Sequence, residues 1–270
     1  MNLESIDLSS PLVMGILNVT PDSFYDGGSN DSPTAIRNHI EAMLKAGAGI
    51  IDIGAYSSRS GAEDVSPQEE FNRLKVALEI IRTHFPETIV SIDTFRLDVI
   101  KTVVDFFGDV IINDISGGEY DADMIAYSAK QKLPYICMHM QGTPKTMQEK
   151  PHYDNVVTEV LTFFDEKIKE AESYGLKQFI VDPGFGFGKT VEQNYTLFNH
   201  LEDFVALKYP VLVGISHKSM IQKVLDCSAK EALNGTTILN TIALLKGAKI
   251  LRVHEVKEAI EVVKIVKKFQ

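Results

Sequence analysis

The sequence has only two cysteines, no long apolar run and a shortage of basic residues, and each scarcity excludes a class of protein. Cys137 and Cys227 belong to no CxxC or Cys/His pattern, which argues against a zinc module or a disulfide framework. Two reduced thiols are typical of a reducing compartment, so we expect a cytoplasmic protein. No run of about 18 apolar residues is present and the N-terminus has no basic region like that of a signal peptide, so no membrane association is expected.

Basic residues are outnumbered by acidic ones, 27 to 37, and the formal net charge is −10. Nucleic acids and anionic membranes are bound by clustered Lys and Arg, so neither is an expected partner. Small molecules are the expected ligands. If one of them is an anion, the positive charge that binds it must be concentrated locally.

Eight short runs rich in Val, Ile and Leu recur along the chain. Each is continuously apolar, as expected of parallel strands that are covered on both faces. The predicted strands are Leu12–Val19, Gly49–Gly54, Thr88–Asp93, Val110–Ile115, Pro134–His139, Gln178–Asp182, Pro210–Ser216 and Lys249–Val253.

Longer amphipathic stretches separate these runs, and several have helix-start or helix-stop residues. Ser32-Pro33 and Ser66-Pro67 place a cap residue before a proline of the first turn, while Gly47 and Gly175 are suited to helix ends. The predicted helices include Thr34–Ala46, Pro67–His84, Leu97–Phe107, Asn155–Tyr174 and Glu231–Lys246. Eight strand–helix units in 270 residues predict an α/β fold, a (β/α)₈ TIM barrel of a single domain spanning residues 1–270. A doubly wound open sheet is the competing architecture.

Every predicted strand has a polar or charged residue at or just beyond its carboxyl end, and in a barrel these ends form the active-site face. Asp, Asn and Ser at such junctions often cap the next helix, which is the alternative explanation for any one of them. Eight together, with opposite charges meeting at one mouth, favour a binding site. The strand-end residues are Asn18, Ser57, Ser58, Arg59, Asp93, Asn113, Asp114, Met138, His139, Asp182, Ser216, Lys218, Arg252 and His254.

One group of these residues is suited to an anion. Arg59, Arg252 and His254 can donate hydrogen bonds to phosphate oxygens. Asn18 offers a neutral oxygen to Mg²⁺, which usually takes one or two protein ligands together with substrate phosphates and water. The alternative for Arg252 is a surface ion pair with Glu255.

A second group is suited to a flat heterocycle with mixed donors and acceptors. Asp93 and Asp182 accept, Asn113 does both and Lys218 donates, and a carboxylate matches the paired N–H groups of a 2-amino-pyrimidinone edge. Met138 provides an apolar wall. The alternative is a buried structural network, with Asp182–Lys218 as an ion pair. His139 is interpreted either as a group behind the ring or as a satisfied core histidine.

The glycine-rich segment Asp182–Lys189 matches neither of the two nucleotide-binding glycine motifs. We interpret it as a turn between strand and helix that directs Asp182 and Phe187 into the mouth.

Together these segments resemble dihydropteroate synthase, over nearly the whole chain. The resemblance rests on Met14–Phe24, Asp26–Gly28, Ser91–Thr94, Ile112–Ile115, Asp182–Lys189 and Arg252–His254. It implies the condensation of 6-hydroxymethyl-7,8-dihydropterin pyrophosphate with 4-aminobenzoate, with Mg²⁺ as cofactor and a homodimer as the usual assembly. Implied site residues are Asn18 for the metal, Ser58, Arg59, Arg252 and His254 for pyrophosphate, Asp93, Asn113, Met138, Asp182 and Lys218 for the pterin, and Phe24, Phe187 and Ser219 for the aminobenzoate and its loops.

Two segments depart from the family pattern. The loop Gly54–Gly61 has Tyr56, Ser58 and Ser60 where the family has Glu, Thr and Pro, and the segment Ser216–Ser219 reads S-H-K-S instead of S-R-K-S. These changes border the aminobenzoate site, so they bear on sulfonamide sensitivity more than on activity. The remaining alternatives are a pterin-binding methyltransferase, which would not need the Thr-Pro-Asp-Ser-Phe loop or the Arg-x-His pair, and a catalytically inactive pterin-binding paralogue.

Overall fold

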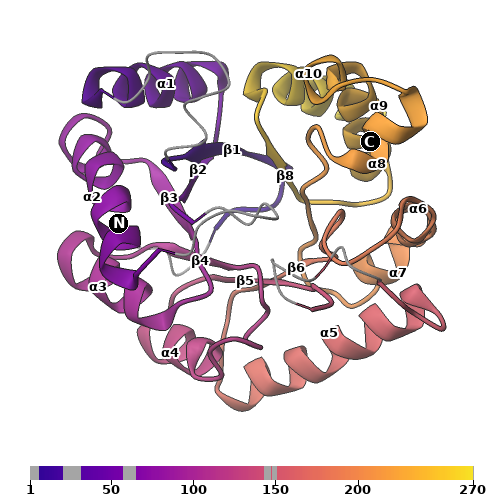
Figure 1. Cartoon of the computed structure of the whole chain (residues 1–270), viewed down its shortest axis with the longest axis horizontal. Coiled ribbons are helices and arrows are strands. Elements are labelled where there is room, and N and C mark those ends of the chain that lie inside the picture. The colour runs from indigo at the N-terminus through magenta and orange to yellow at the C-terminus, as the bar shows by residue number, and fades with distance from the viewer. Residues whose placement is uncertain (1–5, 21–31, 57–64, 143–146, 148–150, 270) are drawn as a thin grey trace.

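The chain forms a nearly closed barrel of eight parallel strands surrounded by helices (Figure 1). The computed structural model describes residues 6–20, 32–56, 65–142, 147 and 151–269. The strands are β1 Leu12–Asn18, β2 Ile50–Gly54, β3 Ile89–Asp93, β4 Ile111–Asp114, β5 Tyr135–Met138, β6 Phe179–Asp182, β7 Leu212–Val213 and β8 Ile250–Val253.

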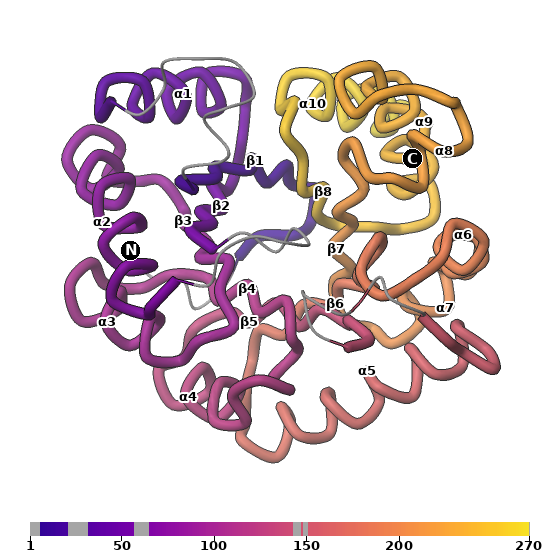
Figure 2. The backbone as a smooth tube through the Cα atoms, viewed as in Figure 1, coloured from indigo at the N-terminus to yellow at the C-terminus, as the bar shows by residue number. Residues whose placement is uncertain are grey.

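The strand order is that of a barrel. Each of β1 to β5 pairs with the next strand in sequence, and β8 pairs with both β1 and β7. An isolated parallel bridge between Val181 and Val211 joins the two remaining edges. Figure 2 follows this single circuit, in which β8 returns beside β1. The predicted barrel is confirmed, and the doubly wound alternative is wrong.

The helices lie outside the strands. They are α1 Pro33–Ala46, α2 Pro67–His84, α3 Leu97–Phe107, α4 Met124–Gln131, α5 Val156–Ser173, α6 Val191–Asn199, α7 Leu201–Val205, α8 Ser219–Leu225, α9 Leu233–Leu245 and α10 Val256–Val266, with a 3₁₀ turn, η2, at Ala229–Glu231. No helix of the described ranges is long and apolar enough to cross a membrane.

Local chemistry explains the helix boundaries. The Ser32 hydroxyl accepts from the Ala35 N–H at the start of α1, and Ser66 caps α2 in the same way. A proline then occupies the first turn of each helix, where its missing N–H costs nothing. Gly47 ends α1 with a φ of 108°, a conformation that glycine adopts without strain. These predicted start and stop signals are confirmed.

Strand β7 is much shorter than the predicted Pro210–Ser216. Its ladder contains only Leu212–Val213, because Pro210 has no N–H to donate. The chain also leaves the sheet early, since the Lys218 N–H donates to the Ile215 carbonyl and forms a turn. The early turn brings the residues after β7 to the rim of the barrel.

Alternate residues of each strand point into the barrel, where they form two layers. The lower layer is apolar and fully packed, and consists of Met14, Ile50, Ile111, Ile136, Ile180, Leu212 and Ile250. The upper layer is formed, in most strands, by the inward-facing residue two positions later in the sequence. It is largely polar and includes Asp52, Asn113, Asp182 and Arg252. The intervening residues, such as Ile51, Ile112 and Val181, face the helices in a separate and larger core. The barrel interior is therefore apolar in its lower layer and largely polar in the upper layer, at the carboxyl ends of the strands.

Candidate functional site

Several of the strand-end residues named from the sequence lie around one mouth, at the carboxyl ends of the strands. Asn18 pairs in register with Gly54, Gly54 with Asp93, and Asp93 with Asn113. On the opposite side Met138 pairs in register with Asp182. These pairings place one amide, two carboxylates and a second amide around a common mouth.

Asp52 also belongs to this site, although the strand-end pattern did not single it out. It is completely buried two residues before Gly54, so it faces the barrel interior. The side-chain N–H₂ of Asn113 lies 3.2 and 3.3 Å from its two carboxylate oxygens. The signal for Asp52 was the alternation along β2, where a charged residue interrupts a strand of apolar neighbours.

Arg252 connects β8 to carboxylates of β2 and β3. It lies two residues after Ile250 of the lower layer and pairs in register with Met14, and its long side chain reaches both carboxylates. Its Nε donates to Asp52 and its Nη2 donates to Asp93, and both hydrogen bonds are 2.7 Å long. Burial alone would lower the pKa of Arg252, but these two carboxylates raise it. A surface ion pair with Glu255, the alternative weighed above, is wrong.

Burial shifts the acids of the mouth toward their neutral forms. It raises the pKa of Asp93 to about 7, although Arg252 opposes the shift, and the nearby Asp52 adds to it. Burial also raises the pKa of Asp182, against the attraction of Lys218 and a 2.9 Å hydrogen bond from the Gly184 N–H. The protonation of both carboxyl groups therefore depends on which groups surround them.

Lys218 is the second cation of the mouth. Burial lowers its pKa to about 8, and Asp182 opposes that shift. Its ammonium group donates to the Phe185 carbonyl and lies 4.3 Å from the centre of the Phe187 ring. The ammonium therefore lies between a carboxylate, a carbonyl and an aromatic face, all of which favour its charged form.

An apolar cluster forms the wall of the same mouth. Phe95, Ile115 and Met138 are buried together, and Tyr56 and Phe187 pack against them. Tyr56 and Phe95 meet edge to face with ring centres 5.1 Å apart. Met138 thus belongs to an apolar surface beside the polar groups of the mouth.

Lys189 holds the glycine-rich turn from below. Its buried ammonium donates to the carbonyls of Gly184 and Phe187, each at 3.0 Å, and lies 3.1 Å from Nδ1 of His139. An ammonium so occupied within its own loop supports the interpretation as a turn that directs Asp182. His139 is buried with its pKa lowered to about 2 by burial and by Lys189, which makes it a neutral core histidine.

We expect Gly184→Ala to cost about 3 kcal/mol or more of stability. The backbone there has a φ of +69°, and an added methyl group would overlap the His139 carbonyl oxygen. The expected cost combines about 1–2 kcal/mol for the left-handed backbone with about 1–3 kcal/mol for overpacking. Gly175→Ala is the matched control, because φ is +74° but no atom lies within 4 Å of the added carbon. Urea unfolding of both variants separates the two causes; equal losses would rule out the steric one.

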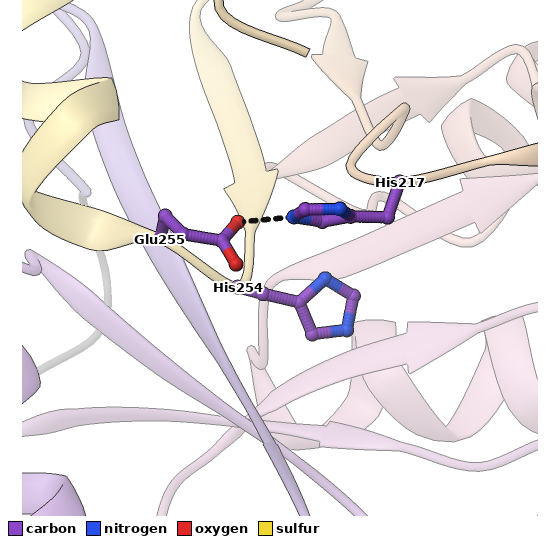
Figure 3. A group of neighbouring side chains, drawn as sticks. All are labelled: His217, His254 and Glu255. Carbon is purple, nitrogen blue, oxygen red and sulfur yellow. Dashed lines mark hydrogen bonds and ion pairs between the residues drawn. The ribbon is translucent and has the colours of Figure 1, made fainter. Parts of the chain in front are cut away.

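Beyond the mouth, the residues after β7 and β8 form a rim (Figure 3). The Ser216 hydroxyl lies 2.9 Å from Nδ1 of His254, and His217 Nε2 lies 2.6 Å from a carboxylate oxygen of Glu255. Ser219 is exposed at the start of α8. Phe24, the segment Asp26–Gly28 and the positions from Ser57 to Gly61, which include Ser58, Arg59 and Ser60, lie outside the described residues.

Comparisons with known proteins identify relatives over nearly the full length. A family model described as pterin binding enzyme matches residues 14–254. A dihydropteroate synthase of Escherichia coli is 45% identical over 264 residues, which cover 97% of this chain and 93% of the relative. A crystal structure of the Yersinia pestis dihydropteroate synthase with a sulfonamide drug complex has a TM-score of 0.90 at 41% identity, covering 98% of this chain and 96% of that one. A Xanthomonas albilineans dihydropteroate synthase with 4-aminobenzoic acid has a TM-score of 0.89 at 34% identity, covering 98% and 95%.

Proposed function

The chain belongs to the pterin-binding enzyme family as a dihydropteroate synthase, and we propose which of its residues serve each substrate. The enzyme condenses 6-hydroxymethyl-7,8-dihydropterin pyrophosphate with 4-aminobenzoate, yielding 7,8-dihydropteroate and pyrophosphate for folate biosynthesis. The observation that carries the assignment of residues is the inward-facing layer of carboxylates and amides, bordered by Lys218, Arg252 and an apolar wall.

In this proposal the pterin ring lies against Met138 and is held by the upper layer of the barrel. Asp182 accepts from the paired N–H groups of the amino-pyrimidinone edge, and Lys218 donates to the ring carbonyl. Asp93 and Asn113 bind the opposite edge of the ring. Support comes from the burial of Asn113 and Asp182 and the partial burial of Asp93 and Lys218, since buried polar atoms must find hydrogen-bond partners and a ring of this polarity offers them.

The pyrophosphate occupies the rim in the same proposal. Arg252 and His254 supply donors from β8, together with Ser58 and Arg59 of the β2 loop. Arg252 donates to Asp52 and Asp93. When the pterin N–H groups take over Asp93, part of the guanidinium is released toward the leaving group. Pterin and pyrophosphate binding are then coupled through one side chain.

We further propose Mg²⁺ as the cofactor, with Asn18 as its protein ligand. The Asn18 Oδ1 atom and the Asp93 carboxylate border the space where a side chain on Gly54 would stand, at 3.2 and 3.6 Å from such a carbon. Because residue 54 is a glycine, this oxygen-lined space is preserved and fits a hard cation. When bound there, Mg²⁺ neutralises negative charge on the pyrophosphate.

The 4-aminobenzoate is assigned to the outer part of the mouth. Phe187 provides a face for its ring, Lys218 attracts its carboxylate or the developing dipole, and Ser219 offers an N–H at the start of α8. Phe24 is included in the proposal because the segment around it resembles a loop that covers the active site in the family. Stacking of Phe187 against Lys218, at 4.3 Å, supports the placement of an aromatic acid nearby.

The chemistry follows from the distribution of charge. Cleavage of the carbon–oxygen bond runs ahead of attack by the aromatic amine, so the exocyclic methylene becomes cationic and conjugated with the ring. Asp93 and Asp182 stabilise that positive charge, while Arg252 and His254 stabilise the negative charge on the departing pyrophosphate. The neutral amine needs no strong base, and its surplus proton is lost to solvent after the new carbon–nitrogen bond has formed.

Because burial raises the pKa of Asp93 to about 7, pterin binding should depend on pH. The ionised carboxylate accepts from ring N–H groups; as pH falls through 7 it takes up a proton, and the affinity should fall about tenfold per pH unit. The measurement is the Kd of 6-hydroxymethyl-7,8-dihydropterin between pH 5.5 and 8, because this ligand keeps the N8–H of the substrate ring but lacks the pyrophosphate, whose own titration would interfere. Asp93→Asn should bind weakly and lose the midpoint near 7; a flat wild-type profile would contradict the role of Asp93.

Pyrophosphate release tests the function itself. Purified protein is incubated with dihydropterin pyrophosphate and Mg²⁺, with and without 4-aminobenzoate. We expect release that depends on the aminobenzoate, with dihydropteroate as the product. Pterin binding without such turnover would point to the non-catalytic alternative.

Three further properties complete the proposal: one domain over residues 1–270, a cytoplasmic location and a homodimer. One eight-stranded sheet with a continuous outer core supports the first. The free thiols of Cys137 and Cys227 support the second. Exposed apolar side chains on α8, α9 and α10 support the third, which sedimentation velocity tests; they are Val224, Leu225, Ile238, Leu245 and Ile265.

A further inference from the structure

Three side chains that commonly bind metal ions converge on the rim, away from Asn18. His217 follows β7, whereas His254 and Glu255 follow β8, and their side chains point toward one another (Figure 3). One ligand atom from each lies within 4.8 Å of the other two. Within the described part of the chain no other trio of His, Cys, Asp or Glu comes so close.

Neighbouring residues hold the backbone and ring of His217 in place. Its φ is 54°, a left-handed conformation that a non-glycine residue adopts only when its surroundings enforce it. The Thr236 hydroxyl accepts from its N–H at 3.1 Å, and the Gln222 amide donates to its carbonyl at 2.6 Å. Its Nδ1 faces the Ala229 carbonyl, which can only accept, so Nδ1 carries a proton and Nε2 is directed at Glu255.

His254 is oriented in a similar way. Its Nδ1 lies 2.9 Å from the Ser216 hydroxyl, which also accepts from the His254 backbone N–H at 3.3 Å. A hydroxyl oxygen has two lone pairs and can accept both. In this tautomer Nε2 carries a lone pair, which takes up either an ion or the proton with which the ring donates to pyrophosphate. Histidines that bind metals usually donate their other ring N–H to such a partner, which fixes the ring.

We propose that His217, His254 and Glu255 form a site for a Zn²⁺-class transition-metal ion, separate from the proposed Mg²⁺ site. Two imidazole nitrogens and one carboxylate oxygen match the ligands of zinc and cobalt, with a fourth position open to solvent. The proton between His217 and Glu255 leaves when the ion enters. Their ligand atoms then separate from 2.6 Å to about 3.3 Å, as tetrahedral arms of about 2.0 Å require.

The site depends on the residue by which this chain departs from the family motif. The motif S-R-K-S has arginine where this chain has His217, and a guanidinium cannot bind a metal ion but can pair with Glu255. His217→Arg therefore removes the ligand while it keeps a cation beside Glu255. Glu255→Gln removes the carboxylate and keeps its shape.

Co²⁺ titration of the tag-free, chelator-treated full chain tests the proposal, with visible absorption as the readout of tetrahedral coordination. We expect saturation at one equivalent in the wild type, and an affinity lower by about 100-fold or more in His217→Arg and in Glu255→Gln. Circular dichroism confirms that each variant is folded.

Two control variants sharpen the result. His200→Ala removes another histidine that pairs with a carboxylate, Asp203, at 3.0 Å, but lacks a third ligand in the described chain. Asn18→Ala removes the proposed Mg²⁺ ligand. Both should bind Co²⁺ like the wild type. The proposal is overturned if the wild type shows no saturable binding, if His217→Arg binds as tightly as the wild type, or if Asn18→Ala abolishes the signal.

Discussion

We expect Asp182→Asn to lower kcat/KM for the dihydropterin pyrophosphate by about 10³-fold, mainly through kcat. The amide has nearly the same shape as the carboxylate, so the 2.9 Å hydrogen bond from Gly184 can persist. What disappears is a buried negative charge that faces the developing cation, and preorganised charges of this kind contribute about 10²- to 10³-fold each. The amide also presents a donor to the ring N–H groups, which adds to the loss. Steady-state pyrophosphate release measures the effect.

Asp114 offers the matched control. It is a buried aspartate at the end of β4, but its side chain faces away from the barrel interior. Its carboxylate accepts from the N–H and hydroxyl of Ser116, the Gly118 N–H and the Tyr135 hydroxyl. Asp114→Asn should cost about 1–3 kcal/mol of stability and change kcat/KM by no more than about threefold. Equal kinetic losses in both variants would show that carboxylate burial, and not position in the mouth, causes the effect.

The second large effect is expected at Arg252, where stability and activity should fall together. Arg252→Met leaves Asp52 and Asp93 buried without their shared cation, and removing one partner of a buried pair costs about 3–5 kcal/mol. The same change removes a donor to the leaving pyrophosphate, so kcat/KM should fall by about 10²-fold or more. Urea unfolding and pyrophosphate release measure the two losses.

A second substitution separates these two roles of Arg252. Asp52→Asn in the Arg252→Met background removes the carboxylate that lost its partner, and should restore a large part of the stability. It should not restore turnover, because the pyrophosphate still lacks its donor. If Arg252→Met were as stable as the wild type, the pairing with Asp52 and Asp93 would have no energetic weight; if the double variant regained activity, Arg252 would act only on the fold.

The sequence alone determined the elements of the barrel, because their signals are local. Continuous apolar runs marked all eight strands, and Ser32, Ser66 and Gly47 marked helix ends through hydrogen bonds and φ angles that involve residues only a few positions apart. β7 was the exception, since its length depends on a proline and on the turn that follows. The strand-end residues Asn18, Asp93 and Asp182 were also visible, because a barrel brings those ends to one face.

Only the tertiary structure decided which of these groups touch one another. Asp52 joined the site, and Arg252 of β8 reached carboxylates on β2 and β3, because strand register decides which side chains meet inside the barrel and no local pattern encodes that register. The pair His217–Glu255 joins residues 38 positions apart in sequence, across two strand ends. Secondary structure follows from interactions between near neighbours, whereas the partners of a charge are chosen by how the strands close into the barrel.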